Sequence, residues 1–261
     1  MNSNHDYKQN GQIIRVSGLK KSFNGSTVLN GIDLRLSRGE NLVIIGKSGT
    51  GKSVLIKCLV RLIEPEAGSM EVLGMDIAGL SEKELVGYRR KVGFLFQGGA
   101  LYDSMTVREN LMFPLERSAR HLSREEMEDR VHEMLRSVNL ESAYNKWPSE
   151  LSGGMKNRIA LARTLVLRPE IIFYDEPTSG LDAVTSREIS ELIVEMQGKH
   201  HMSSIIITHD LSCVKITANR INMLRDGKIV DEGTYEELAS HEDPWISAFF
   251  KLPDKQRTYE G

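Results

Sequence analysis

The most specific chemical pattern in the sequence is the run Gly46-Lys47-Ser48-Gly49-Thr50-Gly51-Lys52-Ser53. Its glycines allow a backbone to wrap around phosphate oxygens, and the N-terminus of the following helix attracts anions. We expect Lys52 to reach the β- and γ-phosphates of ATP and the Ser53 hydroxyl to coordinate Mg²⁺. An ordinary glycine turn is the alternative. The run lies between a predicted strand at 42–45 and a predicted helix at 53–63, which is the context that phosphate binding requires.

Two adjacent carboxylates, Asp175 and Glu176, follow an apolar run at 171–174 that predicts a buried strand. Such a strand carries Asp175 to its carboxyl end, where it can hold Mg²⁺ through water. Glu176 is the natural general base for an attacking water molecule. A solvated helix cap before Pro177 is the alternative, which the phosphate loop makes much less favourable.

A second helix start that suits an anion is predicted at Leu151-Ser152-Gly153-Gly154-Met155. Ser152 is an N-cap residue, and the two glycines leave the first N–H groups accessible. Taken alone, this run predicts only a capped helix with a flexible lead-in. Since one nucleotide needs one phosphate cradle, a second cradle suggests service to a nucleotide held by another copy of the chain.

The elements that must position these residues alternate between strand and helix signals. Apolar and polar residues alternate at 13–16, 28–29 and 32–36, which predicts an antiparallel β-subdomain. Residues 106–140 have a charged helical pattern, and a βαβ rhythm returns with strands at 171–174 and 204–208 and a helix at 183–196. A final hairpin at 221–225 and 228–231 turns at Asp226-Gly227. Three pairs predict capping boxes, namely Ser81 with Glu84, Ser123 with Glu126, and Thr234 with Glu237.

Bulk composition narrows the class of protein. The chain has 261 residues, of which 40% are hydrophobic, so it can bury a substantial core. A net charge of −2 disfavours a nucleic-acid partner, which needs basic surface. We identify no apolar run long enough for a membrane span and no secretory signal at the start. Cys58 and Cys213 lie far apart without metal-ligand spacing, and we expect buried, reduced thiols.

The order of the motifs resembles the nucleotide-binding subunit of ABC transporters over about residues 12–240. The resemblance implies an α/β fold with a P-loop NTPase core and mixed sheet, an N-terminal antiparallel β-subdomain and an inserted helical subdomain at about 100–168. It implies a head-to-tail dimer in which one copy's phosphate loop and the other copy's Ser152–Gly154 segment enclose each ATP.

The same resemblance assigns roles to individual residues. Gln97 would be a ligand of Mg²⁺ and water and the link to a membrane subunit, and His209 would contact the γ-phosphate. Asp182, in the run Ser179-Gly180-Leu181-Asp182, would lie in the loop that links the two sites. Phe23 matches the aromatic residue that stacks on adenine, and the alternative for it is a core position in the first sheet.

One departure from the family concerns Met155, which stands where a glutamine is usual. Methionine cannot hydrogen-bond a ribose or a phosphate, so we expect Met155 to alter the ATPase rate or dimer packing. We expect Ser152 and Gly154 to keep their roles.

The segment at 94–110, which follows the predicted link to the membrane subunit, resembles ATPases paired with MCE-type lipid transport systems. Its small residues Gly98, Gly99 and Ala100 would leave space for a partner helix. The resemblance implies phospholipid transport between the bacterial inner and outer membranes, which maintains outer-membrane lipid asymmetry. It also implies integral membrane permease subunits, an MCE-domain lipid-binding protein, a STAS-domain accessory protein, and a peripheral position on the cytoplasmic face of the inner membrane. An ABC ATPase for another cargo, or a non-transport ABC ATPase such as one for iron–sulfur assembly, remains an alternative.

We divide the chain into a flexible N-terminus at 1–10, an ATPase domain at 11–243 and a tail at 244–261. In the tail, Trp245, Ile246, Phe249 and Phe250 recur at helical spacing and predict one apolar stripe. The stripe either packs on the chain's own body or docks onto another subunit.

Overall fold

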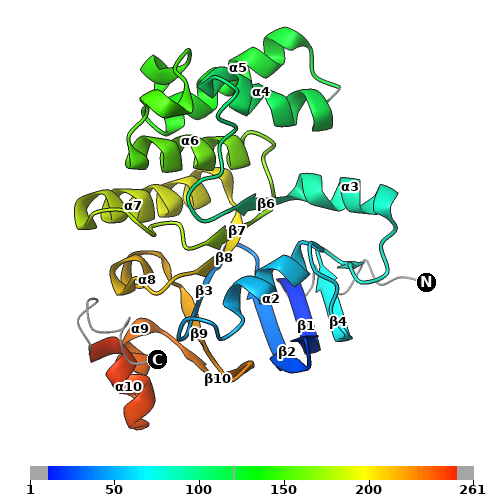
Figure 1. The fold of residues 1–261 in the computed structure, drawn as a ribbon, viewed down its shortest axis with the longest axis vertical. Coiled ribbons are helices and arrows are strands. Elements are labelled where there is room, and N and C mark those ends of the chain that lie inside the picture. Colours follow the sequence, from blue (N-terminus) through cyan, green and yellow to red (C-terminus); the bar gives the residue numbers. More distant parts are fainter. Residues whose placement is uncertain (1–10, 120, 252–261) are drawn as a thin grey trace. The chain divides into compact units, whose positions relative to one another are not determined.

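The computed structural model describes residues 11–119 and 121–251 (Figure 1). The predicted flexible segment at 1–10 and the end of the tail lie outside the described residues. The chain divides into two compact units, and each is treated by itself. The first unit contains the residues up to Gly79 and those from Ile205 onward, and the second runs from Leu80 to Ser204.

An antiparallel sheet with the strand order β2-β1-β4-β5 opens the first unit. Its strands are β1 (Gln12–Phe23), β2 (Ser26–Ser37), β4 (Ala67–Val72) and β5 (Met75–Asp76). β1 and β2 are joined at Asn24 and Gly25, whose φ angles of 50° and 80° are left-handed as a tight hairpin turn requires. The predicted antiparallel subdomain is confirmed, with longer strands than the alternation indicated.

The strand that leads into the phosphate loop is β3 (Asn41–Ile45), and all of its residues are buried. It pairs in parallel with β9 (Arg220–Arg225), and β9 pairs antiparallel with β10 (Lys228–Gly233), which confirms the predicted hairpin. α2 (Lys52–Leu59) follows the loop and ends before the predicted residue 63. The φ angle of Arg61 is 56°, a left-handed conformation that stops the helix.

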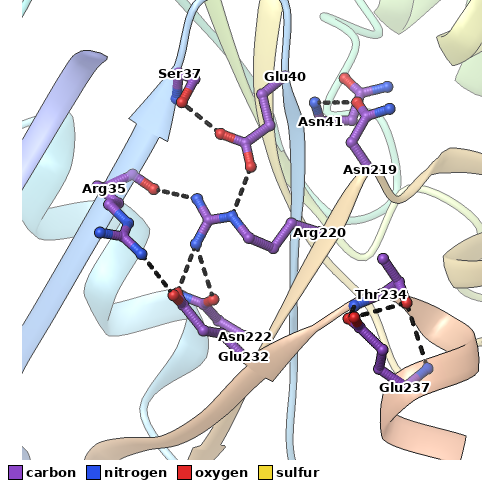
Figure 2. Close-up of polar contacts among 10 residues, drawn as sticks. All are labelled: Arg35, Ser37, Glu40, Asn41, Asn219, Arg220, Asn222, Glu232, Thr234 and Glu237. Carbon is purple, nitrogen blue, oxygen red and sulfur yellow. Dashed lines mark hydrogen bonds and ion pairs between the residues drawn. The ribbon is translucent and has the colours of Figure 1, made fainter. Parts of the chain in front are cut away.

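Polar contacts centred on Arg220 fix the start of β3 (Figure 2). The Arg220 guanidinium donates to Glu40 at 2.7 Å and to Glu232 at 2.7 Å. Beside it, the Asn41 N–H donates to the Asn219 side-chain oxygen at 2.8 Å. Because ion pairs that are partly buried and share hydrogen bonds resist opening, these contacts hold β3 in register with β9.

The second unit contains most of the helices and one parallel strand pair. Its elements are α3 (Glu82–Lys91), β6 (Val92–Leu95), α4 (Val107–Ser118), α5 (Arg124–Ser137), 3-10 helices at Glu141–Ala143 and Pro148–Glu150, α6 (Gly153–Leu165), β7 (Ile171–Asp175) and α7 (Ala183–His200). Capping boxes open α3 and α5 as predicted. β6 pairs with β7 and was not predicted, because four residues with a glycine among them give little periodic signal.

The chain closes with short elements, and all of their residues from Ile205 onward belong to the first unit. β8 (Ser203–Ile207) leads to α8 (Leu211–Thr217), and α9 (Tyr235–Ala239) and α10 (Pro244–Lys251) come last. A capping box at Thr234 opens α9, as predicted.

On α10, part of the predicted apolar stripe packs on the chain's own body. Ile246 and Phe250 are only 4% and 8% exposed. The Phe250 ring meets Tyr235 edge-on, and the Arg225 guanidinium lies 4.6 Å from the Trp245 ring centroid. At least these residues of the stripe therefore have partners within one chain.

Two further predictions concern cysteines and membrane spans. Cys58 and Cys213 are both buried, which confirms the predicted burial of the two thiols, and no disulfide joins them. Burial raises the pKa of the Cys58 thiol to about 11. Within the part of the chain that the structure describes, no helix has the length and apolar character to cross a membrane.

Candidate functional site

The phosphate loop connects β3 to α2 through residues 46–51. Gly49 and Gly51 have left-handed φ angles of 80° and 99°, conformations that glycine adopts without strain. Gly51 is the N-cap of α2, and no side chain caps the helix there. An uncapped helix N-terminus after a glycine loop presents N–H groups to an anion, so this local structure suits phosphate.

Lys52 brings its positive charge to the same loop. Its ammonium donates to the carbonyl oxygens of Gly46 and Lys47 at 2.8 and 2.9 Å, and its side chain is buried. Phosphate oxygens are stronger acceptors than these carbonyls because they are charged. When a nucleotide binds to the loop, we expect the Lys52 ammonium to donate to a β- or γ-phosphate oxygen in place of these carbonyl oxygens.

The loop needs glycine at two positions because neighbouring backbones approach it closely. A Cβ atom at Gly46 would lie 2.3 Å from the Leu224 carbonyl oxygen on β9. One at Gly51 would lie 2.9 Å from the Val28 carbonyl oxygen on β2. Both contacts are with backbone atoms that cannot turn away, so β9 and β2 fix the position of the loop.

Two other predicted site residues belong to the first unit. Phe23 is the last residue of β1 and is 42% exposed, so the alternative of a core position is wrong. The Lys21 ammonium lies 5.2 Å from the Phe23 ring centroid, and the ring remains accessible enough to stack on a base. His209 is exposed in the turn between β8 and α8.

The predicted acidic pair lies at the end of β7 in the second unit. Asp175 is the last residue of the strand and is 7% exposed. Glu176 follows with a φ of 52°, a left-handed conformation that is uncommon outside glycine. Its carbonyl oxygen accepts from the Ser179 N–H at 3.2 Å in the turn that follows. Strained backbone of this kind is typical of functional sites and persists only where its surroundings hold it.

Gln97 lies close to the loop that follows Glu176. The Gln97 side-chain amide donates to the Ser179 hydroxyl at 3.1 Å. The structure therefore brings Gln97 together with the loop of the acidic pair, although Gln97 and Ser179 are 82 positions apart in the sequence.

The N-terminus of α6 carries the second predicted cradle. The Ser152 hydroxyl accepts from the Met155 N–H at 3.3 Å, which confirms Ser152 as the N-cap. Ser152 and Gly153 are exposed. A Cβ atom at Gly154 would lie 2.6 Å from the Thr185 methyl group. Gly154 is thus needed for close packing of α6 against the start of α7.

Asp182 lies beside this contact. Its carboxylate accepts from the Thr185 hydroxyl at 2.6 Å and from the Val184 N–H at 3.0 Å, so it caps α7. The hydrogen bonds from Thr185 hold the pKa of Asp182 below its usual value. Thr185 therefore joins the Gly154 segment to Asp182, and the sequence analysis missed it. The one signal in the sequence that could have indicated this role is Asp182, a typical N-cap residue that lies three positions before Thr185.

The predicted site residues thus form two groups. Phe23, the phosphate loop and His209 belong to the first unit. Gln97, Asp175, Glu176, Asp182 and the Ser152–Gly154 segment belong to the second. Over residues 11–119 and 121–251, no cluster of three or more His, Cys, Asp or Glu side chains could hold a metal ion. The predicted ligands of Mg²⁺ are the hydroxyl of Ser53, the amide oxygen of Gln97 and the carboxylate of Asp175. These oxygen donors fit Mg²⁺ when phosphate and water oxygens complete its coordination.

Comparison with known proteins places this site in a class. The family model described as "ABC transporter" matches residues 29–179. A methionine import ATP-binding protein, MetN, from Rhizobium johnstonii is 40% identical over 85% of this chain and 61% of its own length. A probable ribonucleotide transport ATP-binding protein, mkl, from Mycobacterium leprae is 40% identical over 92% of this chain and 69% of its own length. The chain therefore spans about 61–69% of the length of these curated relatives.

Solved structures agree with that class. A dimeric ATP-binding cassette in a post-hydrolysis state with ADP and Pi is similar with a TM-score of 0.78 and 31% identity, covering 85% of this chain and 98% of that one. The protein cbiO1 from Clostridium perfringens, part of the ABC transporter complex cbiONQ, gives a TM-score of 0.81 and 28% identity, covering 93% of this chain and 100% of that one.

The phosphate loop with its uncapped helix, in an α/β fold of this kind, defines an ATPase of the ATP-binding cassette class. The match over residues 29–179 covers more than half of the chain, and the chain belongs to the ABC transporter family.

Proposed function

We propose that this chain binds and hydrolyses MgATP as the motor subunit of an ABC transporter that moves phospholipid between the bacterial inner and outer membranes. The observation that carries the ATPase part is the phosphate loop, with Lys52 held in it and α2 left uncapped. In this proposal the loop holds the phosphates, Phe23 stacks on adenine and His209 contacts the γ-phosphate.

The hydrolytic step is assigned to the second unit. Glu176 takes a proton from the attacking water, and Gln97 orients that water. Ser53, Gln97 and Asp175 would hold Mg²⁺, which would neutralise developing charge on the phosphates. The strained φ of Glu176 and the contact of Gln97 with Ser179 support these assignments.

We also propose that the site is completed by a second copy of the chain. The N-terminus of α6 exposes Ser152 and Gly153, and Asp182 lies beside them through Thr185. The phosphates of a nucleotide on the loop before α2 already have one helix N-terminus to bind them. The N-terminus of α6 is therefore free to bind a nucleotide held by another copy. A similar cassette was solved as a dimer with ADP and Pi, which supports this arrangement.

The lipid cargo rests on the segment at 94–110, which resembles that of MlaF, the ATPase of a bacterial phospholipid transport system. In this chain the segment is held from below by Asn110, which is fully buried. The Asn110 amide donates to the carbonyls of Tyr102, Met105 and Thr106 at 3.0–3.1 Å. These contacts hold residues 102–106 of the segment, in which Tyr102 is 46% exposed.

The proposed partners follow from that resemblance. They are integral membrane permease subunits, an MCE-domain lipid-binding protein and a STAS-domain accessory protein, with the chain peripheral to the cytoplasmic face of the inner membrane. A relative in Arabidopsis thaliana, 37% identical over 91% of this chain, has the name "Protein TRIGALACTOSYLDIACYLGLYCEROL 3, chloroplastic", which contains the name of a galactolipid. A lipid-related name among the relatives supports the choice of cargo class.

A second candidate is methionine import, which the 40% identity to MetN favours. Mass spectrometry of the complex purified in detergent separates the two candidates. Phospholipid transport predicts co-purified permease and MCE-domain chains with bound phospholipid. A methionine-binding partner, or purification with no membrane protein at all, would overturn the lipid proposal.

A matched variant makes the experiment specific to the segment. Tyr102→Asp places a charge on the proposed docking surface, and we expect it to lose the permease chains. Asp103→Asn, an exposed neighbour, should retain them.

A further inference from the structure

Asn157 lies on α6 one turn after the exposed Ser152–Gly154 segment, and its side chain contacts a loop outside the helix. It is only 8% exposed. Its side-chain amide donates to the Pro177 carbonyl oxygen at 3.3 Å, in a buried contact. Pro177 is the residue immediately after Glu176, so this hydrogen bond reaches the loop of the proposed base.

The other end of the same amide lies against a different loop. A Cβ atom at Gly99 would be 3.2 Å from the Asn157 side-chain oxygen and 3.1 Å from the Ala160 Cβ atom. Gly99 is buried and follows Gln97 by two residues. Asn157 thus lies between the segment after Gln97 and the segment after Glu176, on the helix whose start is the second anion cradle.

Glu176 needs such support because its conformation is costly. A non-glycine residue in the left-handed region is strained, and surrounding contacts must hold it there. Proline at the next position restricts the backbone further. On the far side of the loop, Ser186 donates to the Thr178 carbonyl oxygen at 3.5 Å, a longer contact than that made by Asn157.

We propose that Asn157 is a positioning residue for Glu176, through which α6 sets the orientation of the base in its own chain. This inference rests on the proposed role of Glu176. Because the start of α6 would contact a nucleotide held by the second copy, Asn157 would connect that nucleotide to the base of its own chain.

The test is Asn157→Leu, which keeps the approximate volume and removes the donor. We expect kcat for ATP to fall on the order of 10-fold, since small displacements of catalytic groups cost up to about 100-fold. We expect ATP affinity, measured with a fluorescent nucleotide, to stay within twofold of the parent. Thr164→Val is the control on the same helix, because it loses a hydrogen bond to the Ala160 carbonyl oxygen while the Thr164 methyl group lies against Gly93 of β6.

A double variant separates positioning from general loss of stability. If Asn157 acts through Glu176, adding Asn157→Leu to Glu176→Gln lowers the residual turnover no further. A further 10-fold loss in that background, or a loss equal to that of Thr164→Val, would overturn the inference. Normal turnover of Asn157→Leu beside an inactive Glu176→Gln would sink this inference alone, whereas normal turnover of Glu176→Gln would remove the proposed base itself.

Discussion

The N-termini of α2 and α6 are both suited to phosphate, yet they are built differently. α2 begins at Gly51 with no side-chain cap, and the loop before it wraps back so that Lys52 bonds its carbonyls. α6 begins at Ser152, which caps the helix with its own hydroxyl. The first is a cradle with its own lysine as the first residue of the helix, whereas the second is a capped, exposed helix start whose first lysine is Lys156, the fourth residue of the helix.

The difference teaches which part of the site acts alone. The loop before α2 can hold the phosphates by itself, whereas the start of α6 is suited to add contacts to phosphates that another loop already holds. Glu176 lies on neither helix start. It lies on the loop that Asn157 and Gln97 contact through hydrogen bonds. ATP binding, completion of the site by a second copy, and ATP hydrolysis should therefore depend on different residues.

The largest expected effect is on hydrolysis. Glu176→Gln should lower turnover by roughly 10²- to 10⁴-fold, because a general base contributes that much, while ATP still binds. Steady-state phosphate release and equilibrium nucleotide binding measure the two quantities. Glu170→Gln, just before β7, is the control and should keep normal turnover. Parent-like phosphate release by Glu176→Gln would show that another group activates the water.

The next effect is on binding at the complete cradle. Lys52→Ala removes a charged donor worth about 1.5–3 kcal/mol, so ATP affinity should fall by roughly 10- to 150-fold and hydrolysis with it. Isothermal titration with ATP measures the loss. Lys57→Ala, farther along the same helix, should bind as the parent does. If Lys52→Ala retained its affinity, the loop would not be the phosphate site.

A smaller effect concerns the cap of α6. Ser152→Ala should destabilise the nucleotide-free chain by about 1 kcal/mol, the usual contribution of a serine N-cap, and should also lower turnover. Thermal unfolding gives the first quantity. Ser123→Ala removes the N-cap of α5 and should cost similar stability with no change in turnover. Equal turnover in the two variants would mean that the start of α6 has a structural role alone.

The smallest expected effect is that of Met155, where the family usually has glutamine. The Ser152 hydroxyl accepts from the backbone N–H of residue 155 whatever its side chain, so Met155→Gln should leave the helix intact. Glutamine adds a hydrogen-bonding group near the proposed interface, and we expect a change of a few-fold in turnover or dimer affinity, on the order of 1 kcal/mol. If both quantities were identical to those of the parent, the departure would have no consequence.

Local signals carried most of the sequence-based prediction. Ser152, Ser81 and Ser123 cap their helices as predicted, and the turn at Asp226-Gly227 has left-handed φ angles of 50° and 71°. These features depend on a few consecutive residues, so the sequence displays them directly.

Features that depend on distant residues were missed. β6 is too short for a periodic pattern, and α2 ends early at Arg61 although its apolar spacing continues. Asn157 and Thr185 looked like ordinary helix residues, because their roles come from Pro177 and Gly154, which only the folded chain brings near them. Even the exposure of Phe23 could not be told from its spacing on an alternating strand.

The central claim is that the start of α6 completes a phosphate loop on a second copy, and assembly tests it most directly. We predict that Glu176→Gln with MgATP sediments as a dimer and without nucleotide as a monomer. Adding Gly154→Asp should prevent the dimer while ATP still binds, since a side chain there meets the Thr185 methyl group at 2.6 Å and places a carboxylate near phosphate. A Glu176→Gln chain that stays monomeric with ATP bound, or a dimer indifferent to Gly154→Asp, would contradict the account.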